Sequence, residues 1–253
     1  ADERRQAAVA LAFRAQLQAT REGRLRPIVH RKSMPLDAFS SGPSVWSLLN
    51  ASYCRGHVKD MSGGIGRGRA PPKFFCDRGL RTKPDCVVYS FGSQGDTRFE
   101  AAMSSAFAHC EIHIFDPTVG PSDFTFGGMN GALPPRCAFH RVGIRGRYAE
   151  DALDATHRSP ILNMDLRTIM ARLGHDRIDV LKMDVEGSEW ASLEDIFGGP
   201  QQSDVFPLGE HHRKNPLVGN LLVEVHLTPS ISPGRTVRDA LELHAMLTDR
   251  AGF

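Results

Sequence analysis

The sequence lacks several features that would narrow its class at once. No hydrophobic run among its 253 residues approaches transmembrane length, so no segment is expected to span a bilayer. The formal net charge of +2 is too small to indicate a nucleic-acid-binding surface, and internal repeats and long low-complexity tracts are absent. A content of 41% hydrophobic and 24% charged residues excludes a disordered or fibrous chain. What remains is a globular chain, long enough for one large domain and an appendage.

Cysteine is sparse, and its spacing excludes the common zinc motifs. The five cysteines form neither a CxxC pair nor a Cys/His pattern typical of zinc sites. Cys86 and Cys110 lie in apolar, strand-like runs, so we expect both to be free thiols in the core. Cys54 and Cys76 flank a glycine-rich segment, and that placement is equally compatible with a disulfide and with two free thiols. The compartment therefore stays open: secretory or luminal if Cys54 and Cys76 pair, cytoplasmic otherwise.

The first 80 residues show no sustained periodicity. Residues 1–20 are expected to form a short basic helix, for which a solvated surface is favoured over a membrane or partner contact. Gly63–Gly68 resembles a phosphate-binding loop, but Pro71 and Pro72 follow it where a helix should begin. A flexible loop is therefore the better interpretation. We predict an irregular N-terminal cap with a basic helix over residues 1–80.

A regular alternation of strand and helix patterns begins at residue 86. Strands are predicted over residues 86–91, 110–115, 137–144, 178–187 and 220–227. Helices are predicted over residues 96–108, 164–174, 188–197 and 236–247. This alternation predicts an α/β domain over residues 81–253, with a mostly parallel sheet and helices on both of its faces.

The segment Ile178–Trp190, with the sequence IDVLKMDVEGSEW, carries the strongest functional signal. Its apolar residues alternate with Lys182, Asp184 and Glu186 before the chain turns at Gly187. Because successive strand side chains point to opposite faces, the three charged residues are expected to share one side and to face a crevice at the end of the strand. A solvated strand end with one incidental ion pair is the alternative.

The first predicted strand runs into a glycine turn that suits a nucleotide-like ligand. Gly92 and Gly95 let the backbone approach a ligand closely as the chain turns into a helix. About twenty residues later the second strand ends in Asp116, where an acid can accept hydrogen bonds from ribose hydroxyls. Alternatively, the glycines serve only the turn and Asp116 caps a loop ahead of Pro117. The G-x-G-x-x-G spacing of nicotinamide-dependent oxidoreductases is missing, which disfavours that class.

Taken together, these segments resemble the FkbM-type S-adenosylmethionine-dependent methyltransferases and the related eukaryotic methyltransferase-like proteins. The IDVLKMDVEGSEW block carries the resemblance, with support from VVYSFGSQGDTRFE, IFDPT, ILNMDLRTIM and LLVEVHL, and it extends from Asp77 to about Phe253. It implies a Rossmann-like methyltransferase fold that binds S-adenosylmethionine. The implied acceptor is a hydroxyl on a small molecule, sugar or lipid, and nothing in the sequence indicates the oligomeric state.

The resemblance also implies a set of cofactor-binding positions. By motif these are Ser90, Gly92, Ser93, Gln94, Gly95, Asp116 and Asp184. Ser90 stands where many methyltransferases carry an acid, so its contact is expected to be weaker or to be supplied by Glu100 instead. The sheet of such enzymes normally ends in a β-hairpin, which this chain lacks before Phe253, and the chain begins at Ala1 without Met. We therefore expect an excised piece of a longer protein, without the C-terminal hairpin.

Removal of a proton from an acceptor hydroxyl needs a base, and the candidates are Asp184, Glu186, Glu224 and His226. His226 titrates nearest neutrality, and it shares a strand face with Glu224; both converge with Asp184 if their strands are neighbours. The alternatives are a purely structural histidine and an ion pair of Lys182 with Glu224 or Asp184. No tight ligand spacing demands a metal, and none is predicted. A methyltransferase-shaped module that only binds partners is the alternative function.

Overall fold

The computed structural model describes residues 57–61, 73–77, 79–120, 133–147, 162–198, 217–226, 230–235 and 237–247. The predicted helix over residues 1–20, the Gly63–Gly68 loop and Cys54 lie outside these ranges and stay predictions. The chain divides into two compact units. One consists of Lys59–Phe75 and Gly79–His226, and the other of Ala1–Val58, Cys76–Arg78 and Leu227–Phe253. The predicted domain boundary at residue 80 remains a prediction. In the described ranges, no helix is both long enough and apolar enough to cross a membrane.

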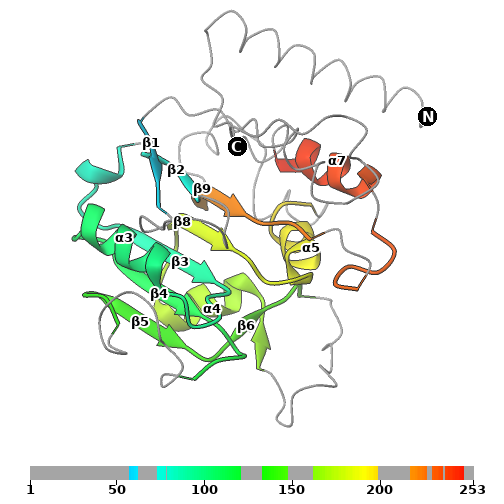
Figure 1. Cartoon of the computed structure of the whole chain (residues 1–253), viewed down its shortest axis with the longest axis horizontal. Coiled ribbons are helices and arrows are strands. Elements are labelled where there is room, and N and C mark those ends of the chain that lie inside the picture. The colour runs from blue at the N-terminus through cyan, green and yellow to red at the C-terminus, as the bar shows by residue number, and fades with distance from the viewer. Residues whose placement is uncertain are drawn as a thin grey trace, which may run out of the picture. The chain divides into compact units, whose positions relative to one another are not determined.

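The larger unit is built around a five-stranded sheet with the order β5-β4-β3-β8-β9 (Figure 1). The strands are β3 (Val87–Phe91), β4 (Glu111–Phe115), β5 (Cys137–His140), β8 (Ile178–Met183) and β9 (Val218–Val223). All neighbouring strands pair in parallel. Every residue of β8 is buried, as expected for a strand of a parallel sheet that is covered on both faces. The predicted α/β class with a mostly parallel sheet is confirmed.

Helices follow or precede the strands as the alternation predicts. In the larger unit they are η2 (Leu80–Thr82), α3 (Arg98–Ala106), α4 (Leu166–Leu173) and α5 (Ser188–Leu193), which continues as the π-helix η4 (Glu194–Gly198). Helix α4 begins at the cap residue Asp165, whose side chain accepts a hydrogen bond from the Thr168 amide, and it ends at Gly174 with a φ of 75°. The second unit contains α7 (Val237–Ala245).

Strands β8 and β9 end earlier than predicted, at Met183 and Val223, and two further regions differ from the prediction. The segment expected to be irregular contains β1 (His57–Asp60) and β2 (Phe74–Asp77), which form a two-stranded sheet. The strand predicted over residues 137–144 is split, because the amide of Val142 turns back to the carbonyl of His140 and ends β5. The chain then forms β6 (Gly143–Ile144), which pairs with β7 (Asn163–Met164) in a separate sheet.

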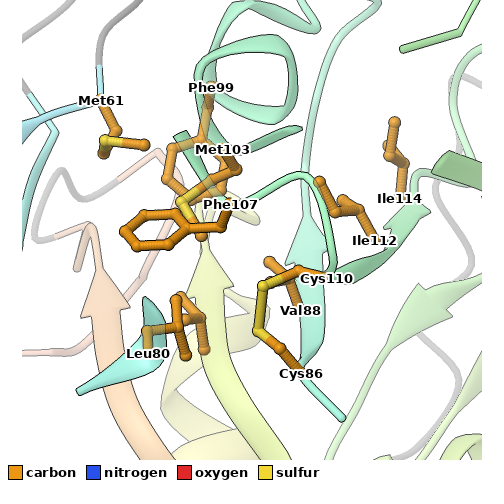
Figure 2. Close-up of a cluster of buried hydrophobic side chains, with 11 residues drawn as sticks. Met61, Leu80, Cys86, Val88, Phe99, Met103, Phe107, Cys110, Ile112 and Ile114 are labelled. Atoms are coloured by element: carbon orange, nitrogen blue, oxygen red, sulfur yellow. A yellow bond between two sulfur atoms is a disulfide. The ribbon is translucent and has the colours of Figure 1, made fainter. Parts of the chain in front are cut away.

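A hydrophobic core lies between α3 and one face of the sheet (Figure 2). The strands contribute Val88, Ile112, Ile114 and Val180, and the helix contributes Phe99 and Met103. Cys86 and Cys110 lie in this core and form a disulfide, with their Cα atoms 4.4 Å apart. The prediction of two free core thiols is therefore wrong. These residues precede β3 and β4, and the parallel pairing of the two strands, which no chain spacing reveals, brings them side by side.

The opposite face of the same strands is aromatic. The rings of Phe91 and Phe115 are stacked with their centroids 4.4 Å apart, and the Tyr89 ring lies 5.0 Å from that of Phe115. All three side chains are buried. Alternation along β3 and β4 therefore separates an aliphatic face, covered by α3, from an aromatic face.

Candidate functional site

The carboxyl ends of β3 and β8 form the topological switch point of the sheet. From β3 the chain passes through α3 to β4 on one side, whereas β8 lies on the other side of β3 (Figure 1). Open parallel sheets bind ligands beyond the strand ends at such a point. The glycine turn follows β3 and the DVEG segment follows β8, so the two motifs singled out in the sequence meet at this place.

Gly92 is the residue at which the two strand ends touch. It has a φ of 79°, and a Cβ at this position would lie 1.7 Å from the carbonyl oxygen of Asp184. Its amide donates to the Phe115 carbonyl at 2.9 Å, and the Asp184 amide donates to the Phe91 carbonyl at 3.1 Å. Only glycine combines this backbone conformation with so close an approach. The end of β3 is thus fixed between the ends of β4 and β8.

Asp116, predicted to bind ribose, holds the glycine turn to the end of β4. Its Oδ2 accepts from the amides of Ser93 at 2.8 Å and Gln94 at 2.7 Å and from the Ser93 hydroxyl at 3.2 Å. Its Oδ1 accepts from the amide of Thr118 at 2.9 Å and from its hydroxyl at 2.6 Å. Burial opposes ionisation, but the hydrogen bonds, led by those from Thr118, outweigh it and lower the pKa of Asp116. These five bonds use the acceptor capacity of the carboxylate, and they hold the turn against the end of β4.

Two of the predicted catalytic acids share one cation. The Nζ of Lys73 lies 3.1 Å from Oδ2 of Asp184 and 3.7 Å from Oε2 of Glu224. The side chains of Asp184, Glu224 and His226 offer ligand atoms within 4.8 Å of one another, so the three converge as expected for neighbouring strands β8 and β9. No sequence pattern marks Lys73, because it lies in the segment predicted to be irregular. Its single positive charge offsets only part of the charge of the two carboxylates.

His226 is oriented by a buried acid. The Oε1 atom of Glu189 lies 3.1 Å from Nδ1 of His226 and accepts a hydrogen bond from the His226 amide at 2.7 Å. Its Oε2 accepts from the amide of Gly187 at 2.7 Å. The side-chain hydrogen bond to Glu189 outweighs burial and raises the pKa of His226. Glu189 was not among the predicted site residues, although an acid in the first turn of the helix after DVEG is a signal for it.

The glycine turn and the DVEG segment also contact each other through Gln94 and Glu186. The side-chain amide of Gln94 donates to Oε1 of Glu186 at 3.0 Å. Both residues adopt a φ of 46°, which is uncommon for residues other than glycine. Glu186 is exposed, so this bridge lies at the rim of the site.

Lys182 does not face the crevice that the sequence predicted. It pairs in register with Ser90 on the face covered by α3, where it is 4% exposed. Its ammonium donates to the carbonyl of Gly92 at 2.7 Å, and Lys73 takes the predicted place beside Asp184 and Glu224. The expected ion pair of Lys182 with these acids is therefore wrong. Burial lowers the pKa of Lys182, and the negative charge of Glu100 is the largest effect that opposes this.

Ser90 and Glu100 lie beneath the turn. Both are fully buried, and the Ser90 hydroxyl donates to Oε1 of Glu100. Burial raises the pKa of Glu100, and the positive charge of Lys182 opposes this. Of these three buried residues, Lys182 donates a hydrogen bond to the carbonyl of Gly92, and Ser90 donates one to Glu100.

Comparison with known proteins adds a family to this geometry. A family model described as a methyltransferase domain matches residues 33–239, which is more than half of the chain. The chain belongs to this methyltransferase family. It is similar to the probable methyltransferase-like protein 24 of Rattus norvegicus, with 33% identity over 150 residues, and to that of Homo sapiens, with 32% identity over 150 residues. Each match covers 58% of this chain and 34% of the relative, so it spans about a third of the length of these relatives. No solved structure matches the chain significantly.

A methyltransferase must hold a methyl donor and an acceptor next to each other. Six of the predicted cofactor-binding residues lie at the switch point: Gly92, Ser93, Gln94, Gly95, Asp116 and Asp184. Ser90 is the exception, because its hydroxyl is bonded to Glu100 in the interior. Three of the predicted proton acceptors, Asp184, Glu224 and His226, lie close together at the adjacent ends of β8 and β9.

Proposed function

We propose that this chain is an FkbM-type methyltransferase that uses S-adenosylmethionine to methylate a hydroxyl on a small molecule, sugar or lipid. The observation that carries the proposal is the turn at Gly92, which is pressed against the carbonyl of Asp184 and tied to Asp116. This turn lies at the switch point, where α/β sheets bind nucleoside-containing ligands. Membership of a methyltransferase family supports methyl transfer as the reaction.

The residues of the turn have separate roles in this proposal. The backbone of Gly92–Gly95 approaches the cofactor, and Asp184 faces its methionyl part. Asp116 keeps the turn in place, and it contacts a ribose only by sharing an oxygen that already accepts hydrogen bonds from the turn or from Thr118. Bound S-adenosylmethionine supplies the methyl group from its sulfonium. Holding the acceptor oxygen in line with the bond that breaks then lowers the barrier.

His226 is the proposed base. Its Nδ1 faces Glu189, and no partner of its Nε2 occurs among the described residues, so Nε2 is available to accept the proton of the acceptor hydroxyl. The carboxylate of Glu189 stabilises the imidazolium that forms. Lys73 contacts both Asp184 and Glu224, and these two carboxylates lie next to His226.

Calorimetric titration of the full chain with S-adenosylmethionine tests the cofactor. We expect binding, and we expect Asp184→Asn to weaken it about tenfold or more, since a hydrogen bond to a charged group contributes about 1.5–3 kcal/mol. The matched control is Asp176→Asn, which changes an exposed aspartate ahead of β8, away from the switch point, and should bind like the parent. Absence of S-adenosylmethionine binding together with binding of NADH would support the oxidoreductase alternative instead.

Turnover separates an enzyme from a binding module. With hydroxyl-bearing sugars, lipids and small molecules as acceptors, we expect methyl transfer that His226→Gln removes while cofactor binding persists. The turnover number should rise with pH through the raised pKa of His226, because the base must be neutral. Cofactor binding without turnover on any of these acceptors would favour the non-catalytic module.

A further inference from the structure

A second group of ionisable side chains lies on the aromatic face, at the amino end of the sheet. Glu111 is the first residue of β4, and His113 follows two positions later on the same face. His175 lies in the connection between α4 and β8. The sequence separates His175 from the other two, and tertiary structure brings the three together. No role in methyl transfer uses them, because the switch point lies at the opposite strand ends.

The three side chains converge on one point. Their ligand atoms, one carboxylate oxygen and two ring nitrogens, all lie within 4.8 Å of one another. The Nε2 of His113 is 3.0 Å from Oε1 of Glu111, and the Nε2 of His175 is 3.9 Å from Oε2 of Glu111. Ligands at about 2.1 Å from a tetrahedral zinc ion are about 3.4 Å apart, which falls within this range.

The other ring nitrogen of each histidine already has a partner. The Nδ1 of His113 lies 2.9 Å from Nε2 of His140, and the Nδ1 of His175 lies 2.7 Å from the hydroxyl of Tyr89. In metal sites of proteins, the ring nitrogen that does not bind the metal is held in this way, which fixes the tautomer and the ring orientation. Both Nε2 atoms thereby lie near the same carboxylate, that of Glu111.

One of these nitrogens is buried without a hydrogen bond. The side chain of His113 is 5% exposed, and its Nε2 has no hydrogen-bond partner among the described residues. Oε1 of Glu111 is near enough, but it lies out of line with the direction in which the ring nitrogen donates. A buried ring nitrogen left in this state costs free energy, whereas a cation between nitrogen and carboxylate satisfies both.

We propose that Glu111, His113 and His175 bind a divalent transition-metal ion, with zinc as the metal that best fits their donors. Two imidazoles and one carboxylate form a set that zinc accepts, whereas calcium and magnesium prefer oxygen ligands alone. Since the Glu111 side chain is 48% exposed, water can reach the fourth position. Such an ion would fix the start of β4 to the connection ahead of β8.

Two other groups of side chains could bind a metal by composition, but each already has a partner or a covalent bond within the protein. The Asp184, Glu224 and His226 group at the carboxyl end has the ammonium of Lys73 against both carboxylates. In the group of Cys86, His109 and Cys110, the two sulfur atoms are joined in a disulfide and so are not thiolates. The experiment must distinguish these three places.

Equilibrium dialysis of the metal-free, oxidised full chain against zinc, read by elemental analysis, tests the proposal. We expect one zinc ion per chain. Glu111→Gln changes a half-exposed side chain and should remove the ion without disturbing the core, as should His175→Gln. Tyr89→Phe keeps all three ligands and should weaken binding about 10–100-fold, the effect of losing an outer hydrogen bond to a ligand. The matched control is Asp184→Asn with Glu224→Gln, which should bind zinc like the parent.

Cobalt replaces zinc as a spectroscopic probe in the same samples. Visible d–d bands without a thiolate charge-transfer band are expected for nitrogen and oxygen donors alone. The proposal is overturned if the folded chain binds no zinc, or if Glu111→Gln and His175→Gln bind as the parent does. It is equally overturned if the control variant loses the ion or if the cobalt form shows a thiolate band.

Discussion

The two ends of the central sheet both gather ionisable side chains, but they satisfy them differently. At the carboxyl end, Asp116 accepts five hydrogen bonds, and Lys73 forms ion pairs with both Asp184 and Glu224. At the amino end, the ring nitrogen Nε2 of His113 has no hydrogen-bond partner among the described residues. Burial lowers the pKa of His113 to about 4, whereas the hydrogen bond to Glu189 raises that of His226.

This difference separates a preorganised site from an incomplete one. The carboxyl end holds its backbone turn and its charged groups through contacts within the protein, so a cofactor would meet a formed edge. The amino end has two histidines that are oriented by outer partners, and both of their Nε2 atoms lie near the carboxylate of Glu111. The first arrangement fits a reaction site, and the second fits a site that a cation completes.

The largest expected effect compares two glycines that have similar positive φ angles and lie at opposite ends of the sheet. Gly92→Ala places a Cβ 1.7 Å from the Asp184 carbonyl oxygen, so we expect a loss of at least about 4 kcal/mol in the free energy of unfolding and loss of cofactor binding. The matched control is Gly174→Ala at the end of α4, with a φ of 75° and no atom within 4 Å of the new Cβ. It should lose only about 1–2 kcal/mol. Urea unfolding measures both, and equal losses would contradict the steric explanation.

The next comparison removes one lysine side chain that contacts the sheet at each end, the buried Lys182 and the partly exposed Lys83. Lys182→Met leaves Glu100 buried without its main opposing charge, and we expect a loss of about 3–5 kcal/mol in the free energy of unfolding. Lys83→Met removes an ion pair with Asp179. The Asp179 carboxylate still has two partners, the guanidinium of Arg177 at 3.1 Å and the amide of Val87 at 3.0 Å.

The loss from Lys83→Met should therefore be smaller, about 1–3 kcal/mol. Urea unfolding of each variant gives the difference. In the double variant Lys182→Met with Glu100→Gln, the uncompensated charge is absent and part of the stability should return. A double variant no more stable than Lys182→Met would show that Glu100 is not the partner.

Reduction of the disulfide affects the amino end alone. The bond between Cys86 and Cys110 links positions 24 residues apart, for which loop closure predicts about 3–4 kcal/mol of stabilisation. Unfolding of the oxidised protein and of Cys86→Ala with Cys110→Ala should differ by this amount, while calorimetry should show unchanged cofactor binding in the folded variant. Mass spectrometry under non-reducing conditions checks the bond itself. Two free thiols in protein that was never exposed to reductant would restore the original prediction.

The smallest expected effect concerns the pKa of His226. Glu189→Gln removes the first cause of the raised value, so NMR titration of the imidazole should show a lower pKa than in the parent. Because the folded-state pKa is raised, the associated stability is present below the ordinary value of about 6.5 and is lost as pH rises through the folded value. Glu224→Gln, which removes a charge without a hydrogen bond, should lower the pKa less. If the pKa of His226 were the same in Glu189→Gln as in the parent, Glu189 would not be the residue that raises it.

The sequence was sufficient for the class of fold, and it marked three motifs that the fold brings together at one end of the sheet. Strand and helix periods from residue 86 onward predicted the parallel sheet, and the glycine turn, Asp116 and the DVEG segment meet at its switch point. These features depend on local patterns and on the rule that parallel strands end at the same edge. The partners of the charged residues were not predictable in the same way. Lys73, for which no role was predicted, pairs with Asp184 and Glu224, whereas Lys182 lies on the face that helix α3 covers and donates to the carbonyl of Gly92.

By itself, the sequence determined the alternation of strands and helices from residue 86 onward, since this alternation follows from periodicity and backbone preference. Only the tertiary structure decided the contacts between distant segments: the bond of Cys86 with Cys110, the hold of Glu189 on His226, and the group of Glu111, His113 and His175. The physical reason is that strand order and register set which side chains become neighbours. Neither is encoded in the spacing of residues along the chain.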